Sequence, residues 1–402
     1  MAIRGQHLRW LRRSLLALAL LLGAGITTLL LVYPTEYVRR LAMWGDADVG
    51  DQYRFPQRAI AHRPGIADPP AQPLSDRVRL AFAAAQPSAD MDTWLAEQGT
   101  LAFVVMQHGR VIHESYFDGV TRSTPLTSFS IAKSILSALF IAARADGHID
   151  SLDEPLTRYV PELLRRDPRF ARITLRHLLN MQSGIAYREI PFFNGDNAKT
   201  YYWPDLRELA LRHTRVTEPP GGDFLYNNYH PLLLGLVLER ATRVPVTQYL
   251  SQRLWQPTGL GPGASWSLDS EASAFEKLES GVNARALDFA RFGQLFLDGG
   301  LAADGTRVLP EADVREATSR GGAVPLDVWR SGLAYKQFWW IQQRDRGNDN
   351  FSARGNHGQF VFVAPATGVV IARLGTRYGQ AAGRWMDLFE RISDELGRPD
   401  AR

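Results

Sequence analysis

An α+β fold is predicted from two observations: strand-like segments lie near both ends of residues 96–402, and helical patterns fill the stretch between them. The strands should form one antiparallel sheet flanked by helices, built from about 96–135 and 326–402. Residues at about 136–325 should form a mostly helical inserted subdomain. We also expect one transmembrane helix before this domain.

The N-terminal region carries the predicted membrane anchor. Residues 14–33 are uncharged and mostly apolar, and about 20 such residues can cross a hydrocarbon core of ~30 Å as a helix. Arginine is more frequent before this run than after it, so residues 1–13 should be cytoplasmic. A cleaved signal peptide is the alternative, although its apolar region is usually shorter. We therefore expect a single-pass protein of a bacterial inner membrane, with the lipid bilayer as a partner through the anchor and the catalytic domain in the periplasm.

Prolines and glycines mark the next boundaries along the chain. Residues 34–95 are rich in proline, which blocks regular hydrogen bonding, and should form a tether or a wrapping segment. Gly109 and Gly368 stand in turns between strand-like segments, as expected for hairpins. The predicted strands are 101–106, 110–117, 359–363 and 369–374. The predicted helices include 206–213, 230–241, 284–297 and 383–396.

Composition excludes several classes of site. The chain has no cysteine, which removes disulfides, thiolate catalysis and cysteine-ligated zinc. Its net charge of +4 is spread along the sequence without a Lys/Arg block, so no nucleic-acid partner is expected. The nine histidines show no ligand spacing, and the Gly-x-Ser-x-Gly, His-Glu-x-x-His and P-loop motifs are absent. We therefore expect neither a metal nor a cofactor.

Ser130-Ile-Ala-Lys133 is the most informative motif. Positions three apart share one face of a helix, so the Lys133 amine can reach the Ser130 hydroxyl. The apolar run at 134–143 would bury this turn and lower the pKa of the amine, which would let it accept the serine proton. One Ser-x-x-Lys is expected by chance in roughly a quarter of such chains, so the motif needs support from other segments.

Tyr226-Asn227-Asn228 is the second candidate segment, and it follows a loop rich in proline and glycine. A phenol near a lysine ammonium ionises more easily and can act as general base toward Ser130, then as general acid toward the leaving group. Asn228 would present its amide to the lysine or to a substrate carbonyl. The alternative is a loop tyrosine followed by turn-forming asparagines.

Gly355-Asn356-His357-Gly358-Gln359 is the third segment, placed directly before an apolar strand. Small residues there let a ligand approach the strand edge, so Asn356, His357 and Gly358 are candidate substrate-binding residues. The backbone N–H groups of Gln359 and Ser130 could together form an oxyanion hole. The alternative is a strand-entry turn with an exposed histidine.

In this order, the three segments resemble the serine beta-lactamase and penicillin-binding-protein superfamily. The likeness extends from about residue 95 to the C-terminus and is closest to the class C-like branch, with its esterases, D-amino-acid peptidases and 6-aminohexanoate-dimer hydrolases. Further matching segments are 175–185, 220–228 and 281–293. The resemblance implies a beta-lactamase/transpeptidase-like fold and an acyl-enzyme mechanism. It assigns the nucleophile to Ser130, its proton partner to Lys133, the base to Tyr226 and a position beside the substrate to Asn228.

One departure from the family pattern bears on the substrate. Relatives that bind penicillins carry Lys-Thr-Gly where this chain has Asn356-His357-Gly358, and a lysine there would attract a carboxylate. The resemblance therefore favours hydrolysis of a small ester or amide. The alternatives are a beta-lactamase or D-amino-acid peptidase acting on cell-wall-type substrates, and a non-hydrolysing sensor or binding protein using the same cleft. The stretch 184–203 can rim the pocket, but Tyr187, Glu189 and Asp196 receive no role.

Overall fold

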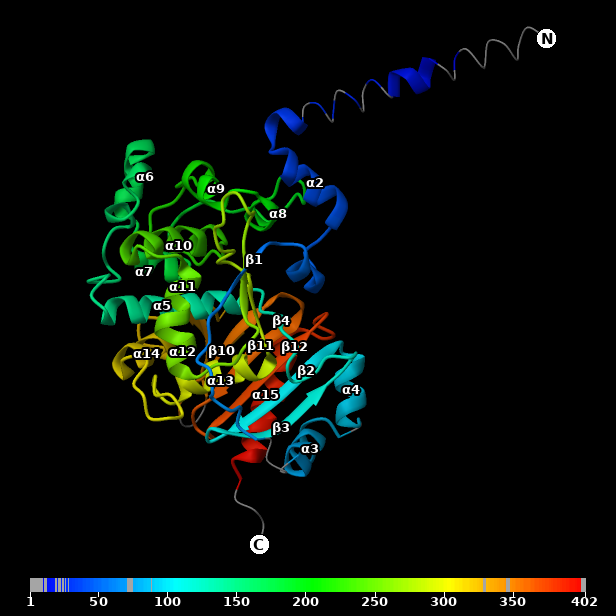
Figure 1. Cartoon of the computed structure of the whole chain (residues 1–402), viewed down its shortest axis with the longest axis vertical. Coiled ribbons are helices and arrows are strands. Elements are labelled where there is room, and N and C mark those ends of the chain that lie inside the picture. The colour runs from blue at the N-terminus through cyan, green and yellow to red at the C-terminus, as the bar shows by residue number, and fades with distance from the viewer. Residues whose placement is uncertain are drawn as a thin grey trace, which may run out of the picture.

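An antiparallel sheet of eight strands forms the centre of the described part of the chain (Figure 1). The computed structural model describes residues 29–70, 75–87, 89–327, 330–344 and 348–398, with scattered residues between 10 and 27. Across the sheet, the order is β3 (Arg110–Tyr116), β2 (Thr100–Gln107), β12 (Val369–Gly375), β11 (Gln359–Ala364), β10 (Asn350–Gly355), β9 (Trp339–Gln342), β8 (Leu333–Lys336) and β7 (Val324–Pro325). The predicted α+β class with an antiparallel sheet is confirmed.

The two ends of the domain meet where β2 pairs with β12, with Val104 opposite Ala372. The hairpin between β2 and β3 turns at His108 and Gly109, whose φ angles of 48° and 76° suit a two-residue turn. These strands and β11 match the sequence prediction closely. Strands β7 to β10 were not predicted.

Helices cover both faces of the sheet (Figure 1). On one face, α3 (Ser75–Ala85), α4 (Met91–Glu97) and α15 (Ala382–Leu396) enclose a cluster that includes Phe103, Phe360 and Phe389. On the other face lie α5 (Ile131–Ala145) and α13 (Ala286–Leu297). Because both faces are covered, every residue of β11 and β12 is buried, and these strands are continuously apolar apart from Gln359 and Arg373.

Most of the remaining helices form the region beyond α5 (Figure 1). They are α6 (Pro161–Arg166), α7 (Leu175–Leu179), α8 (Asp196–Tyr202), α9 (Leu206–His213), α10 (Tyr229–Thr242) and α11 (Val246–Leu250). Helices α12 (Gln256–Thr258) and α14 (Glu311–Thr318) lie nearer the sheet, where α14 contacts α5 and β9. Helix α10 is buried over most of its length and packs on α5, α7 and α9. Helices α9, α10, α13 and α15 confirm the four helices predicted from sequence.

Residues 33–70, which we call the N-terminal strap, run along the helical region into a second sheet. Helix α2 (Thr35–Trp44) lies beside α8, and Arg40 donates to the Tyr202 carbonyl at 3.0 Å. The strand β1 (Gln57–Ala59) then joins a small antiparallel sheet with β5 (Ser265–Ser267), β6 (Val282–Ala284) and β4 (Leu126–Thr127). Further along, Asp68 pairs with Arg285 at 2.6 Å. The strand β4 of this second sheet directly precedes the turn into α5.

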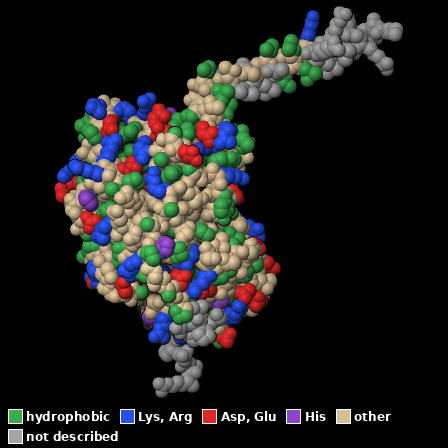
Figure 2. Space-filling model, in the orientation of Figure 1, with side chains coloured by type: hydrophobic (Ala, Val, Ile, Leu, Met, Phe, Trp, Pro, Cys, Tyr) green, Lys and Arg blue, Asp and Glu red, His purple; other side chains and the backbone are tan. Residues whose placement is uncertain are grey.

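No helix among the described residues combines the length and apolarity that a membrane span requires. Most of residues 1–13 and several of 14–33, where the anchor was predicted, lie outside the described residues. The structure therefore gives the predicted anchor no support. On the face seen in Figure 2, acidic and basic side chains are interspersed.

The contact between α13 and the sheet predicts one stability effect. A Cβ added at Gly293 would lie 2.7 Å from Val361 Cγ1 and 2.8 Å from Val370 Cγ1. Since overpacking a core typically costs about 1–3 kcal/mol, Gly293→Val should lower the free energy of unfolding by roughly that amount or more. Gly321→Val is the control because a Cβ at Gly321 would meet nothing within 4 Å. Equal urea midpoints for the two variants would contradict this packing argument.

Candidate active site

Ser130 stands at the N-cap of α5, at the end of a strained turn. The preceding Phe129 has a φ of 41°, which is rare for a bulky residue and needs support from its surroundings. That support comes from two rings, Tyr201 at 6.4 Å and His357 at 5.1 Å between centroids. The half-buried Ser130 makes no side-chain capping bond. Its hydroxyl is therefore left for other partners, at a helix end that favours negative charge.

The end of β10 passes directly beside this turn. A Cβ added at Gly355 would clash with the carbonyl oxygen of Ser128 and lie 3.1 Å from the Cβ of Phe129. Glycine is required here because two backbones approach each other closely. The close approach places the residues after Gly355 at the edge of the site.

Lys133 is bonded to the nucleophile and sealed from solvent. Its Nζ donates to Ser130 Oγ at 2.8 Å and to the carbonyl oxygen of Glu279 at 2.8 Å. The side chain is 1% exposed. Burial lowers the pKa of Lys133 to about 7, while the nearby Glu279 carboxylate acts in the opposite direction. A substantial fraction of the amine is therefore neutral near pH 7 and able to accept a proton.

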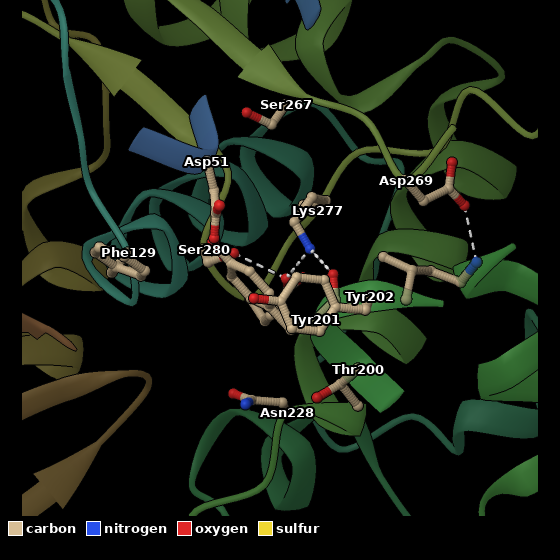
Figure 3. A network of polar contacts seen from close by, with 12 residues as sticks. Asp51, Phe129, Thr200, Tyr201, Tyr202, Asn228, Ser267, Asp269, Lys277 and Ser280 are labelled. Atoms are coloured by element: carbon tan, nitrogen blue, oxygen red, sulfur yellow. Dashed lines mark hydrogen bonds and ion pairs between the residues drawn. The ribbon is translucent and has the colours of Figure 1, made fainter. Parts of the chain in front are cut away.

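A second buried lysine, Lys277, lies between Ser280 and Tyr201 (Figure 3). Lys277 Nζ donates to Glu279 Oε1 at 2.8 Å and to the Tyr201 carbonyl at 2.5 Å. Ser280 Oγ donates to the same Oε1 at 2.8 Å. The ammonium also lies over the rings of Tyr201, at 4.1 Å, and of the strap residue Phe55, at 4.5 Å. Because Lys277 pairs with this carboxylate, Glu279 reaches Lys133 through its carbonyl and not through an ion pair.

Tyr226 closes the third side of the site. The Ser130 side chain acts on its phenol, and Lys133 Nζ lies 5.0 Å from the centre of its ring. The ring also stacks on Trp340, with centroids 6.1 Å apart and planes inclined by 24°. Burial raises the pKa of Tyr226 well above its usual value, and the nearby Ser130 side chain lowers it only in part. The lysine faces the ring and burial disfavours the phenolate, so this geometry gives the predicted base role of Tyr226 no support, and that role stays a prediction.

The side-chain amide of Asn228 is hydrogen-bonded to groups other than Lys133. Its Nδ2 donates to the Tyr187 hydroxyl at 2.9 Å and to Asn197 Oδ1 at 3.3 Å. Its Oδ1 is buried and has no hydrogen-bond partner in the part of the chain that is described. The predicted bond to the lysine is absent from the described contacts, and contact of Asn228 with a substrate stays a prediction.

The rim residues left without a role have structural contacts. Asp196 Oδ1 accepts a hydrogen bond from the Tyr229 hydroxyl at 2.9 Å, and Oδ2 accepts one from the Arg188 N–H at 2.8 Å. Tyr187 supports Asn228, while Glu189 is exposed. No cluster of three metal-ligating side chains was found within the described ranges.

The predicted oxyanion donor Gln359 is wrong, because its backbone N–H donates to the carbonyl of Asn356 in a tight turn. Its side chain is held by β12, with Nε2 donating to the Gly375 carbonyl at 2.7 Å and Oε1 accepting from the Gly375 N–H at 2.9 Å. Asn356 begins the turn, so its own N–H is among those that a helical turn leaves unpaired. It directly follows Gly355 and is the better-placed donor. In the sequence, the signal that could have identified this donor is Gly355, because a glycine permits close backbone approach.

The other two residues of the third segment also differ from expectation. His357 lies with Nε2 2.8 Å from the Ala47 carbonyl and Nδ1 2.9 Å from the Thr376 carbonyl, so it ties the strap to the sheet. Gly358 is buried and accepts a hydrogen bond from Arg373 at 2.6 Å. Because these groups are committed within the fold, the structure gives the expected substrate contacts of His357 and Gly358 no support, and they stay a prediction.

Comparisons with known proteins agree with this arrangement. The 6-aminohexanoate-dimer hydrolase of Paenarthrobacter ureafaciens is 28% identical over 371 residues, covering 88% of this chain and 90% of that protein. Penicillin-binding protein 4 of Amycolatopsis lactamdurans is 27% identical over 319 residues, covering 71% and 81% respectively. A solved structure of a candidate 6-aminohexanoate-dimer hydrolase from Bacillus anthracis shares the fold, with a TM-score of 0.72 and 24% identity over 85% of this chain and 90% of its own. The profile of the beta-lactamase family matches residues 92–389, and the chain therefore belongs to this family of serine hydrolases.

Proposed function

We propose that this protein hydrolyses small esters or amides through an acyl-enzyme on Ser130. The contact that carries the proposal is the 2.8 Å bond between Lys133 Nζ and Ser130 Oγ, because burial holds the pKa of this amine at about 7. The relatives are named for a matching range of chemistry, including 6-aminohexanoate-dimer hydrolysis and D-stereospecific amide hydrolysis. A relative named as a penicillin-binding protein favours cell-wall-type substrates as the second candidate. Anchoring in an inner membrane with a periplasmic domain stays a prediction from the first 33 residues.

In the proposed mechanism, Lys133 accepts the proton of Ser130 as Oγ attacks the substrate carbonyl carbon. The N–H groups of Ser130 and Asn356 stabilise the oxyanion, at the positive end of α5. As the bond between carbon and the leaving group breaks, the Tyr226 hydroxyl donates its proton to the leaving group and takes the proton of the Lys133 ammonium in the same step, so no phenolate accumulates. A water molecule then attacks the acyl-enzyme with Lys133 as base, which releases the acid and restores the serine.

Turnover of an acyl-enzyme predicts a burst of product followed by steady release. With p-nitrophenyl butyrate in excess, the burst should match the enzyme concentration, and intact mass should show one acyl group on Ser130. Ser130→Ala should abolish both signals. A single stoichiometric burst without later release would support the sensor alternative instead.

The environment of Lys133 predicts the pH dependence. The neutral amine is the active form, so kcat/KM should rise with pH through a limb centred near the pKa of about 7. Glu279→Gln removes the carboxylate that raises this pKa, so the limb should move to lower pH. Glu311→Gln is the control, since Glu311 is exposed on α14 and pairs with Arg315. A limb unmoved by Glu279→Gln would show that this carboxylate does not influence the base.

The variant Tyr226→Phe distinguishes the roles of Tyr226 and Lys133 in proton transfer. Loss of the hydroxyl should slow acylation at least about a hundredfold, the usual size of a general acid–base contribution. The remaining activity should keep its rising limb near pH 7 because that limb belongs to Lys133. Disappearance of the limb in this variant would restore Tyr226 as the base.

A further inference from the structure

Arg354 on β10 lies next to the catalytic groups. Its guanidinium carbon is 5.0 Å from the centre of the Trp340 ring, and that ring stacks on Tyr226. Arg354 immediately precedes Gly355, whose backbone lies against the turn that carries Ser130. A continuous series of contacts therefore joins this cation to the nucleophile.

The positive charge of Arg354 is not neutralised within the described part of the chain. No ion pair to a described carboxylate was found, and its Nε donates to Ser352 Oγ at 2.9 Å. The titratable groups that act on it are Arg330, which is charged, and the Tyr378 phenol, which burial keeps neutral by raising its pKa. Arg330 is itself committed, since it pairs with Asp387 and donates to the Gly383 carbonyl at 3.1 Å.

Partial burial without a counter-ion makes this position costly for a cation. Burial, with Arg330 nearby, lowers the pKa of Arg354 to about 9, which leaves the side chain charged at neutral pH. An anion placed against the guanidinium would offset that cost. The terminal nitrogens of Arg354 form the planar fork that suits a carboxylate. They make no ion pair with any described carboxylate.

We infer that Arg354 binds a carboxylate of the substrate, so that the enzyme prefers small esters or amides that carry an anionic group over their neutral counterparts. The inference rests on the proposed hydrolase function and names the substrate class for that same site. It also revises the expectation from the third segment, where the absence of Lys-Thr-Gly suggested that no cation would attract a carboxylate. Here the cation comes from the residue before Gly355.

Two matched substrate pairs test this, because the carboxylate can lie on either side of the scissile bond. The acyl-side pair is the mono-p-nitrophenyl ester of adipate and p-nitrophenyl hexanoate, and the leaving-side pair is 4-acetoxybenzoate and its methyl ester. In at least one pair, Arg354→Met should lower kcat/KM for the anionic member by about tenfold or more, mainly through KM, and change the neutral member by less than about twofold. Arg354→Lys should retain part of the preference. Arg377→Gln is the control for general charge, since Arg377 is exposed and donates to the Glu97 carbonyl.

Equal losses for anionic and neutral members, or an unchanged ratio in both pairs, would overturn the inference and leave Arg354 as support for Trp340. Binding of adipate monoanilide to Ser130→Ala, followed by tryptophan fluorescence, gives a readout without turnover. Arg354-dependent binding together with absent hydrolysis would sink the proposed function while keeping the carboxylate site. Hydrolysis together with Arg354-independent binding would overturn the carboxylate site while keeping the proposed function.

Discussion

The site depends on keeping a substantial fraction of one lysine amine neutral inside the protein. A buried ammonium loses its hydration, so its charged form is disfavoured unless an anion replaces the water. The apolar body of α5 supplies the burial of Lys133, and the contact from Glu279 is a neutral carbonyl. Lys277 completes the arrangement because it binds the carboxylate that would otherwise attract the catalytic proton. Glu279 thus contacts both lysines: its carbonyl oxygen accepts a hydrogen bond from Lys133, and its carboxylate pairs with Lys277.

This arrangement couples distant parts of the chain to the site. The strap residue Phe55 covers Lys277, and Ala47 accepts a hydrogen bond from His357 if that ring nitrogen carries its proton. The rings of His357 and Tyr201 then hold the positive φ of Phe129, which sets the direction of Ser130. A strained backbone beside a nucleophile persists only when contacts with the surrounding residues hold it in place. The strap is therefore part of what positions the catalytic turn.

Local patterns were enough to predict part of the molecule. The hairpin around Gly109 and the 3-residue spacing of Ser130 and Lys133 depend on near neighbours, and both are readable from sequence. The role of the Lys277–Glu279 pair was not predicted because it arises only when the segment 277–279 meets Lys133 on α5. Gln359 was misassigned because the turn at Asn356 consumes its N–H, which no apolar pattern reveals. Arg354 was missed for a related reason, since only the register of β10 beside β9 brings it to Trp340.

The most direct test of this account is the titration of Lys133 itself. In protein with 13C-labelled lysine, the Cε resonance of Lys133 can be assigned by its loss in Lys133→Arg and followed against pH by NMR. The account predicts a midpoint near 7, as burial without an ion pair requires. A midpoint near the ordinary lysine value of about 10.4 would contradict it, because the amine would then be charged at neutral pH and unable to activate Ser130.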